Sequence, residues 1–252
     1  MKPTVRGAEE GGAPASTCAP APTAAPSTQE PVRAGRPAAT HEHREWSPSE
    51  LVERAAALQR RGGRRLLGIT GPPGAGKSTV AAAVVQALQE RALLVPMDGF
   101  HLADAVLDDL GRRDRKGAPD TFDAAGFLHL LRRVRDCHDD VVYAPAFVRE
   151  QEQAIAGALA VPRDVPLVVV EGNYLLLDEG PFAHVRALLS ETWYLDLDPG
   201  TRVERLVARH VQHGRTTTAA QRWVADTDEQ NARLIEGTRS RADLVVRLGM
   251  SP

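Results

Sequence analysis

An eight-residue stretch near the end of the first third of the chain constrains the fold more than any other feature. It reads Gly71-Pro72-Pro73-Gly74-Ala75-Gly76-Lys77-Ser78 and fits the pattern G-x-x-x-x-G-K-[ST]. The run 65–70 before it predicts a short buried strand, and the run 79–88 after it predicts a helix. A strand, a glycine loop and a helix start in this order form the context in which this pattern binds phosphate.

The residues of this loop suit phosphate oxygens for separate physical reasons. Glycines let the backbone curl with its N–H groups pointing inward, and the helix start adds unpaired N–H groups and a positive dipole end. Lys77 supplies a mobile charge for the outer phosphates, and Ser78 offers a hydroxyl to Mg²⁺. Lysine occurs elsewhere only at positions 2 and 116. We therefore assign nucleotide-phosphate binding to the loop and the first helical turn: Gly71, Gly74, Ala75, Gly76, Lys77, Ser78 and Thr79.

Composition limits the remaining possibilities. The net charge of −2 over 252 residues indicates no strong field for nucleic acid or membrane. Residues 1–44, rich in Ala, Pro, Gly, Thr and Ser, predict a disordered tail, and 45–252 then form one domain. Cys18 and Cys137 suggest no disulfide framework, and neither a membrane span nor a signal peptide is visible. We expect a cytoplasmic protein without nucleic-acid or membrane partners, and the sequence leaves a homodimer open.

Alternating strand and helix patterns predict a parallel sheet covered on both faces. Ser47 and Glu50 form a capping box for a helix before the first strand. Asp123 caps a helix to about residue 137, Asp198 precedes another, and Thr218 begins a helix to about residue 235. Segment 141–161 predicts a hairpin. The expected fold class is α/β with three layers and a mainly parallel five-stranded sheet, whose strands are 65–70, 92–97, 166–172, 192–197 and 242–248.

Two carboxylates follow predicted strands at the sheet edge where ligands bind in parallel α/β folds. Glu171 comes after four apolar residues, where a charge is costly to bury unless it meets a cation or hydrogen bonds. We assign Glu171, with Ser78, to Mg²⁺. Asp98 fits either a general base for an attacking hydroxyl or a second metal ligand. An ordinary Asp-Gly turn is the structural alternative for Asp98.

The ordered set of motifs resembles the P-loop kinases that include uridine kinase, pantothenate kinase and phosphoribulokinase. The stretch 115–123 resembles pantothenate kinase most, whereas 143–149, 155–157 and 231–235 are more similar to uncharacterised nucleoside- or sugar-kinase-like bacterial members. The resemblance covers about residues 64–248 and implies the P-loop NTPase fold with a short lid. The segments that carry it are Gly71 to Thr79, Asp98-Gly99-Phe100, Arg115 to Asp123, Tyr143-x-Pro-x-Phe147-x-Arg149 and Glu171-Gly172-Asn173.

The resemblance also implies roles for individual residues. Asp98 would be the catalytic base, acting with Lys77, and Glu171 the Mg²⁺-linked acid. Segment 205–219 would be the lid over ATP, with Arg209 and Arg215 meeting phosphate oxygens, which a guanidinium binds bidentately. The acceptor would bind within about 98–161, against Phe100, His101, Lys116, Tyr143, Phe147 and Arg149. Because the base-reading histidine of uridine kinases is absent from 143–149, nucleosides, sugars and pantothenate-like alcohols all stay open as acceptors.

Other classes of nucleotide-binding protein predict signatures that this sequence lacks. A GTPase-type switch would carry Asn-Lys-x-Asp and a transport ATPase Leu-Ser-Gly-Gly, and neither occurs. A kinase-fold protein without activity would not need Lys77, Ser78, Asp98 and Glu171 together. We therefore expect a kinase with ATP as donor and Mg²⁺ as cofactor, acting on a hydroxyl of a small metabolite. The alternative is a regulatory or NTP-hydrolysing P-loop protein without a metabolite acceptor.

Overall fold

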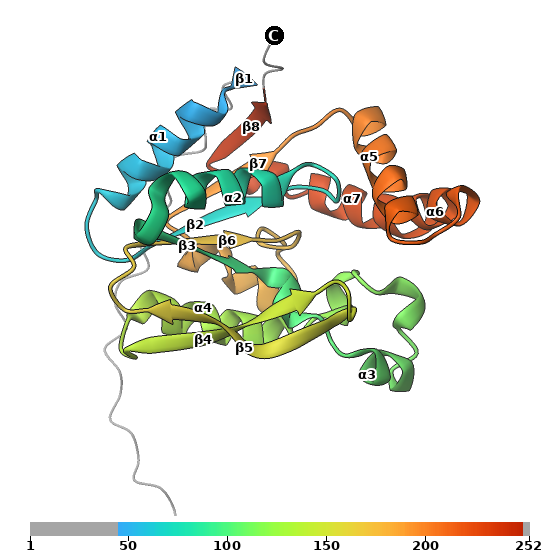
Figure 1. Ribbon diagram of the computed structural model, residues 1–252, viewed down its shortest axis with the longest axis horizontal. Helices are drawn as coiled ribbons and strands as arrows, with labels where there is room; N and C mark the ends of the chain where they lie inside the picture. The colour runs from blue at the N-terminus through green and yellow to red at the C-terminus, as the bar shows by residue number, and fades with distance from the viewer. Residues whose placement is uncertain (1–44, 249–252) are drawn as a thin grey trace, which may run out of the picture. The chain divides into compact units, whose positions relative to one another are not determined.

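The computed structural model describes residues 45–248, so the tail predicted for residues 1–44 lies outside the described part. The centre of that part is a six-stranded sheet with the order β1-β8-β7-β2-β6-β3 (Figure 1). Every neighbouring pair in it runs parallel. Its strands are β1 Glu45–Trp46, β2 Arg65–Thr70, β3 Ala92–Pro96, β6 Leu167–Glu171, β7 Glu191–Leu195 and β8 Leu244–Leu248.

The sheet has one strand more than the five we expected. All five predicted strands are present, and the sixth, β1, is a two-residue strand that pairs with β8 at the edge. Two residues show no periodicity that a sequence pattern could reveal. Trp46 is nevertheless buried, because it packs with the residues of α1 and β8. The three-layer α/β architecture itself is confirmed.

Helices α1 Pro48–Gln59 and α2 Lys77–Leu88 cover one face of the sheet (Figure 1). The predicted capping box is present: the Ser47 hydroxyl accepts from the Glu50 N–H, and the Glu50 carboxylate accepts from the Ser47 N–H at 2.9 Å. Alternate strand residues such as Leu67 and Val169 face these helices, as the two-residue period of a strand requires.

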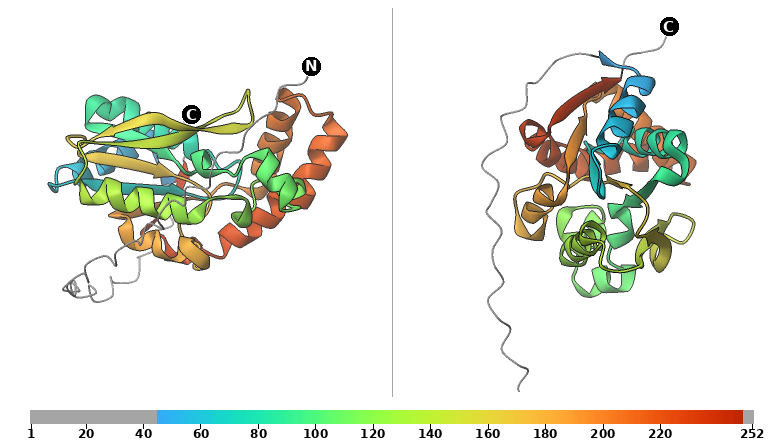
Figure 2. Two further views of the ribbon diagram at one scale, coloured as in Figure 1. Left: turned by 90° about the horizontal axis from the view of Figure 1, so that it is seen from below. Right: turned by 90° about the vertical axis from the view of Figure 1, so that its left-hand side faces the viewer.

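The opposite face carries α4 Ala124–Asp136, α7 Glu229–Glu236 and two 3₁₀ segments, Gly180–His184 and Arg186–Leu188. The predicted hairpin is present as the antiparallel pair β4 Val141–Val148 and β5 Gln153–Pro162, which packs with α4 (Figures 1 and 2). The Asp123 cap of α4 is confirmed, since its carboxylate accepts from the Gly126 N–H at 2.8 Å.

The C-terminal half contributes α5 Pro199–Gln212 and α6 Thr217–Trp223, and a π-helical turn, Val224–Asp228, joins α6 to α7. Asp198 caps α5 as expected. The predicted start of the next helix at Thr218 was wrong, because the hydroxyl of Thr216 accepts from the Ala219 N–H and begins the helix. Thr216, Thr217 and Thr218 carry the same hydroxyl, so the sequence does not show which of them caps the helix, and in the structure it is Thr216.

A short helix, α3 Asp104–Asp109, and the 3₁₀ turns Arg113–Arg115 and Pro119–Thr121 lie between β3 and α4. Within residues 45–248, no helix has the length and apolar character needed to cross a bilayer.

Candidate active site

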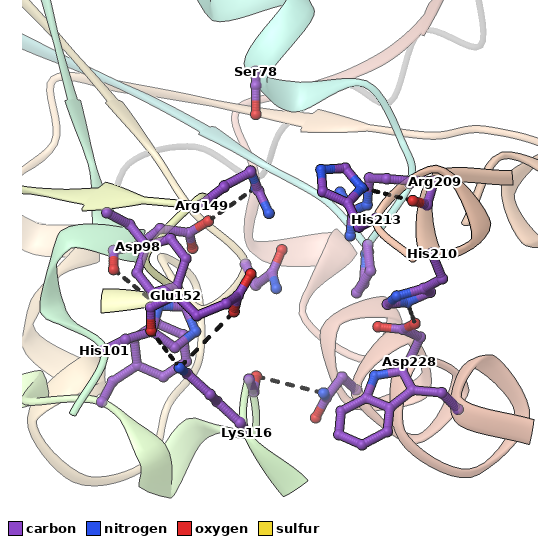
Figure 3. A pocket seen from close by; sticks show the side chains of 18 of the residues that line it. Ser78, Asp98, His101, Lys116, Arg149, Glu152, Arg209, His210, His213 and Asp228 are labelled. Carbon is purple, nitrogen blue, oxygen red and sulfur yellow. Dashed lines mark hydrogen bonds and ion pairs between the residues drawn. The ribbon is translucent and has the colours of Figure 1, made fainter. Parts of the chain in front are cut away.

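A cavity of about 530 Å³ lies where the glycine loop, the hairpin turn and helices α5 to α7 meet (Figure 3). We distinguish three walls. The phosphate-loop wall consists of Pro73, Gly74, Lys77, Ser78, Glu171 and Asn173. The hairpin wall consists of Asp98, His101, Asp104, Arg113, Lys116, Gly117, Phe122, Phe147, Arg149 and Glu152. The helical wall consists of Arg209, His210, His213, Arg215, Trp223, Asp228 and Asn231.

The glycine loop requires glycine where the pattern demands it. Gly71, Gly74 and Gly76 have φ angles of 147°, 82° and 90°, which L side chains rarely adopt. A Cβ on Gly71 would also lie 2.7 Å from the carbonyl oxygen of Leu195. A Cβ on Gly74 would lie 2.9 Å from Cγ of Leu206 in α5. The loop is therefore packed directly between β7 and α5.

Two oppositely charged residues of the phosphate-loop wall are buried. The ammonium of Lys77 donates to the Pro72 carbonyl at 3.1 Å, and burial lowers the pKa of Lys77 against the opposing effect of Glu171 and Asp98. Burial raises the pKa of Glu171, and Lys77 opposes that shift. A phosphate beside Lys77 and a cation beside Glu171 would each stabilise the charged form that burial disfavours.

Two side-chain oxygens, from Ser78 at the start of α2 and Glu171 at the end of β6, could serve as ligands of a magnesium ion. The Ser78 hydroxyl donates to Oε2 of Glu171 at 3.3 Å, so two oxygens stand side by side. Among residues 45–248, no group of three or more His, Cys, Asp or Glu could hold a metal ion. Mg²⁺ typically takes one or two carboxylates together with substrate phosphates and waters. Ser78 and Glu171 therefore suit Mg²⁺ that arrives with a nucleotide.

Asp98 reaches the cavity from the strand end next to that of Glu171. It lies in the 3₁₀ turn Met97–Phe100 directly after β3, and the register places Pro96 opposite Glu171. The two carboxylates thus come from neighbouring strand ends, as the strand-end rule predicts. Arg149 lies with Nη2 3.7 Å from Oδ2 of Asp98, which links the hairpin to the β3 end (Figure 3).

His101 lies between two aromatic rings of the hairpin wall. Its ring centroid is 4.0 Å from that of Phe122 and 4.9 Å from that of Phe147. Nδ1 is 2.9 Å from the Asp98 carbonyl oxygen, and burial lowers the pKa of His101. The neutral ring therefore donates from Nδ1 to that carbonyl, because a carbonyl only accepts.

Lys116 joins three segments of the hairpin wall. Its ammonium donates to Oδ1 of Asp104 at 2.7 Å and to the Glu152 carbonyl at 2.7 Å, and lies 5.4 Å from the Phe147 ring centroid. It lines the cavity as expected, but its charge is already engaged by Asp104 in this structure.

Several residues of the predicted site lie outside the cavity lining. Phe100 packs edge-on against Phe127 at 5.2 Å within the core. Tyr143 is 61% exposed, because its neighbours on β4 face the core and a register shift separates it from Phe147. In the loop, Gly71 and Ala75 are buried, while Gly76 and Thr79 also lie outside the lining.

The helical wall holds both expected arginines and several residues that the sequence did not single out. Arg209 lines the cavity, and the Arg215 guanidinium lies over the Trp223 ring, 4.1 Å from its centroid. Nε2 of His210 is 2.8 Å from Oδ2 of Asp228 (Figure 3). Of the unexpected residues, Asn231 belongs to the similar segment 231–235, and His210 and His213 lie in the expected lid segment 205–219. Trp223 and Asp228 belong to neither, because the sequence does not specify which side of a helix faces the cavity.

The helical wall is anchored to the phosphate loop by a buried arginine. Arg202 in α5 donates to the Pro73 carbonyl at 3.4 Å and pairs with Glu229 of α7 at 2.5 Å. A shift of the phosphate loop would therefore displace Arg202 and, through it, α5 and α7.

Comparisons with known proteins show the family to which the chain is similar. Residues 66–251 match the model described as "Phosphoribulokinase / Uridine kinase family". A Schizosaccharomyces pombe protein named "Putative uridine kinase C227.14" is 33% identical over 181 residues, covering 68% of this chain and 77% of its own. "Uncharacterized protein YggC" of Escherichia coli is 32% identical over 205 residues, covering 79% and 84%.

Solved structures give the same result. The crystal structure titled "putative fructose transport system kinase" from Silicibacter sp. TM1040 has a TM-score of 0.70 and 37% identity, covering 78% of this chain and 98% of its own. The Saccharomyces cerevisiae YFH7 structure, described as a P-loop kinase, also has a TM-score of 0.70, at 18% identity with 82% and 100% covered, and supports the fold alone.

Proposed function

The chain belongs to the phosphoribulokinase/uridine kinase family, and from that premise we propose that it transfers the γ-phosphoryl group of ATP to a hydroxyl of a small metabolite. Membership and the kinase names of its relatives support an ATP-dependent kinase. The observation that carries the transfer to a metabolite is the shared cavity. Lys77, Ser78 and Glu171 line it together with Asp98, which comes from the neighbouring strand end and borders the space for an acceptor.

On the donor side, each group has a distinct task. The loop N–H groups and Lys77 bind the β- and γ-phosphates, and Arg209 and Arg215 supply further positive charge from the helical wall. Ser78 and Glu171 would hold Mg²⁺, which when bound neutralises charge on the phosphates. Phosphoryl transfer needs mainly positioning and charge neutralisation, which these groups provide.

On the acceptor side, Asp98 accepts the proton of the attacking hydroxyl. Arg149 orients the Asp98 carboxylate through their ion pair, and the rings of His101 and Phe147 provide an apolar surface for the carbon skeleton of the acceptor. A sugar is supported by the relative titled a fructose transport system kinase, and a nucleoside by the relative named a uridine kinase. Both compounds present hydroxyl groups without charge.

A phosphotransfer assay tests this proposal. Purified protein is incubated with Mg²⁺-ATP and D-fructose, D-ribose, glycerol, uridine, pantothenate, D-glycerate or fructose 6-phosphate, and products are identified by mass. Phosphorylation of one compound supports the kinase. ATP hydrolysis that no compound accelerates would favour the alternative of an NTP-hydrolysing protein without a metabolite acceptor.

Two variants separate the donor and acceptor roles. Asp98→Asn should lower kcat by about 10²–10⁴-fold, with ATP affinity within twofold of wild type, whereas Asp109→Asn at the exposed end of α3 serves as control. Lys77→Ala should weaken ATP binding. Full turnover of Asp98→Asn would remove Asp98 as the base, and unchanged ATP affinity of Lys77→Ala would contradict the loop assignment.

A further inference from the structure

The His210–Asp228 pair of the helical wall has no role in the phosphoryl transfer described above. The side chains of His210 and Asp228 are only 17% and 12% exposed, yet both line the cavity. A carboxylate only accepts hydrogen bonds, so Nε2 of His210 donates to Oδ2 of Asp228. This hydrogen bond offsets part of the cost of burying the carboxylate, and the remaining acceptor sites of a carboxylate suit hydroxyl groups that donate.

The helical turn that carries Asp228 places it beside the loop that forms the hairpin wall. Asp228 is the last residue of the π-helical turn, a feature frequent at functional sites. Asn231, three residues later and so on the same helix face, donates to the Gly117 carbonyl at 3.4 Å. Gly117 adjoins Lys116 of the hairpin wall. Asp228 therefore lies about one turn from the loop that borders the acceptor space.

A tyrosine hydroxyl contacts the same loop. The Tyr174 hydroxyl donates to the same Gly117 carbonyl at 2.5 Å. Burial raises the pKa of Tyr174, and the charges of Asp98 and Asp228 add to the shift. Asp98 and Asp228 both line the cavity, and Figure 3 shows them on opposite sides of it. A small molecule that reaches Asp98 has the His210–Asp228 pair facing it.

The charges of the hairpin wall indicate which kind of molecule fits there. Lys116 and Arg113 both pair with Asp104, at 2.7 and 2.9 Å, and Arg149 pairs with Asp98. Each cation of this wall therefore already has a carboxylate partner. A phosphorylated or carboxylate acceptor would have to share these cations with their carboxylate partners and would also meet the negative charge of Asp228. A neutral molecule with several hydroxyl groups would do neither.

We propose that the His210–Asp228 pair binds hydroxyl groups of an uncharged polyol acceptor, a sugar or the sugar part of a nucleoside, and so helps to select it. This inference rests on the proposed kinase function. A polyol hydroxyl donates to Asp228 and accepts from or donates to His210, while a second hydroxyl lies at Asp98. The pair does not bind ATP phosphates, because a carboxylate and phosphate oxygens repel and neither can donate.

The test uses the full chain and the seven compounds of the phosphotransfer panel. KM and kcat are measured for the phosphorylated compound and for ATP in wild type, Asp228→Asn and His210→Ala. The matched control is Asp226→Asn, an exposed aspartate of the same π-helical turn that does not line this cavity. Thermal unfolding of each variant shows whether the fold is retained.

The expected substrate is one of the uncharged compounds, D-fructose, D-ribose, glycerol or uridine. Asp228→Asn and His210→Ala should each raise its KM about tenfold to a hundredfold, with the KM for ATP within twofold and Asp226→Asn unchanged. A substrate found only among the anionic compounds would overturn the inference, as would an unchanged acceptor KM or a parallel rise in the KM for ATP, although the kinase function would then stand. Absence of any phosphorylated compound would remove the kinase function and this inference with it.

Discussion

Replacing Gly99 by alanine should disturb the acceptor side of the site without touching the phosphate loop. Gly99 follows Asp98 and is buried against the β4 backbone at Pro145. An alanine Cβ would lie 2.7 Å from the carbonyl carbon of Pro145 and closer still to its oxygen. Ordinary contacts begin at 3.4 Å, so the hairpin must move by about 1 Å, since no flexible side chain can yield instead.

The expected loss of stability and turnover in Gly99→Ala depends on the residues of the hairpin that line the cavity. Phe147 and Arg149 lie two and four residues beyond Pro145, and Arg149 pairs with Asp98. Overpacking of this kind costs about 1–3 kcal/mol of stability. A displacement of about 1 Å between reacting groups lowers turnover by about 10²-fold. ATP affinity should stay within twofold, because the loop and α2 are not involved.

Gly237→Ala is the matched control, since Gly237 has an α-helical φ of −58° and its added Cβ would meet nothing closer than 3.4 Å. It should be neutral or stabilising by up to about 1 kcal/mol. Urea unfolding gives the stabilities, titration with ATP gives the nucleotide affinity, and the phosphotransfer assay gives the turnover. Wild-type stability and turnover in Gly99→Ala would refute the contact with Pro145 as a determinant of the site.

Two further predictions concern the hairpin wall. Because burial lowers the pKa of His101, the folded protein binds fewer protons than the unfolded chain at mildly acid pH. Stability from the neutral ring is therefore present above pH 6.5, the ordinary pKa of histidine, and is lost as the pH falls below it. His101→Gln should show a smaller fall in Tm between pH 7 and about 5 than wild type, and an equal fall would exclude His101 as the cause. Lys116→Met should lower stability by about 1 kcal/mol, because Asp104 loses one of its two partners and keeps Arg113. Since Lys116 lowers the pKa of Asp104, this stability difference should be full above pH 3.8 and shrink as the pH falls through the folded pKa of Asp104. Urea unfolding of both proteins at neutral and acid pH measures it, and an equal stability difference at both pH values would contradict the prediction.

Local patterns were sufficient for the framework and the donor side. The glycines of the loop indicate its backbone conformation, because glycine readily adopts the positive φ angles found at Gly71, Gly74 and Gly76. Apolar runs predict the five longer strands, and the strand-end rule then brings Asp98 and Glu171 to one edge. These inferences succeed because each depends on a few consecutive residues and on the uniform handedness of parallel α/β folds.

The acceptor side depended on packing between segments far apart in the chain. Tyr143 and Phe147 look equivalent in sequence, yet in the β4–β5 hairpin the first faces solvent and the second packs against the His101 ring. His210 and Asp228 are 18 residues apart and meet only because α5 and the π-helical turn pack together. The sequence by itself therefore determined the phosphate loop and the strand-end carboxylates. Only the tertiary structure decided which side chains face them, because facing depends on register and helix rotation.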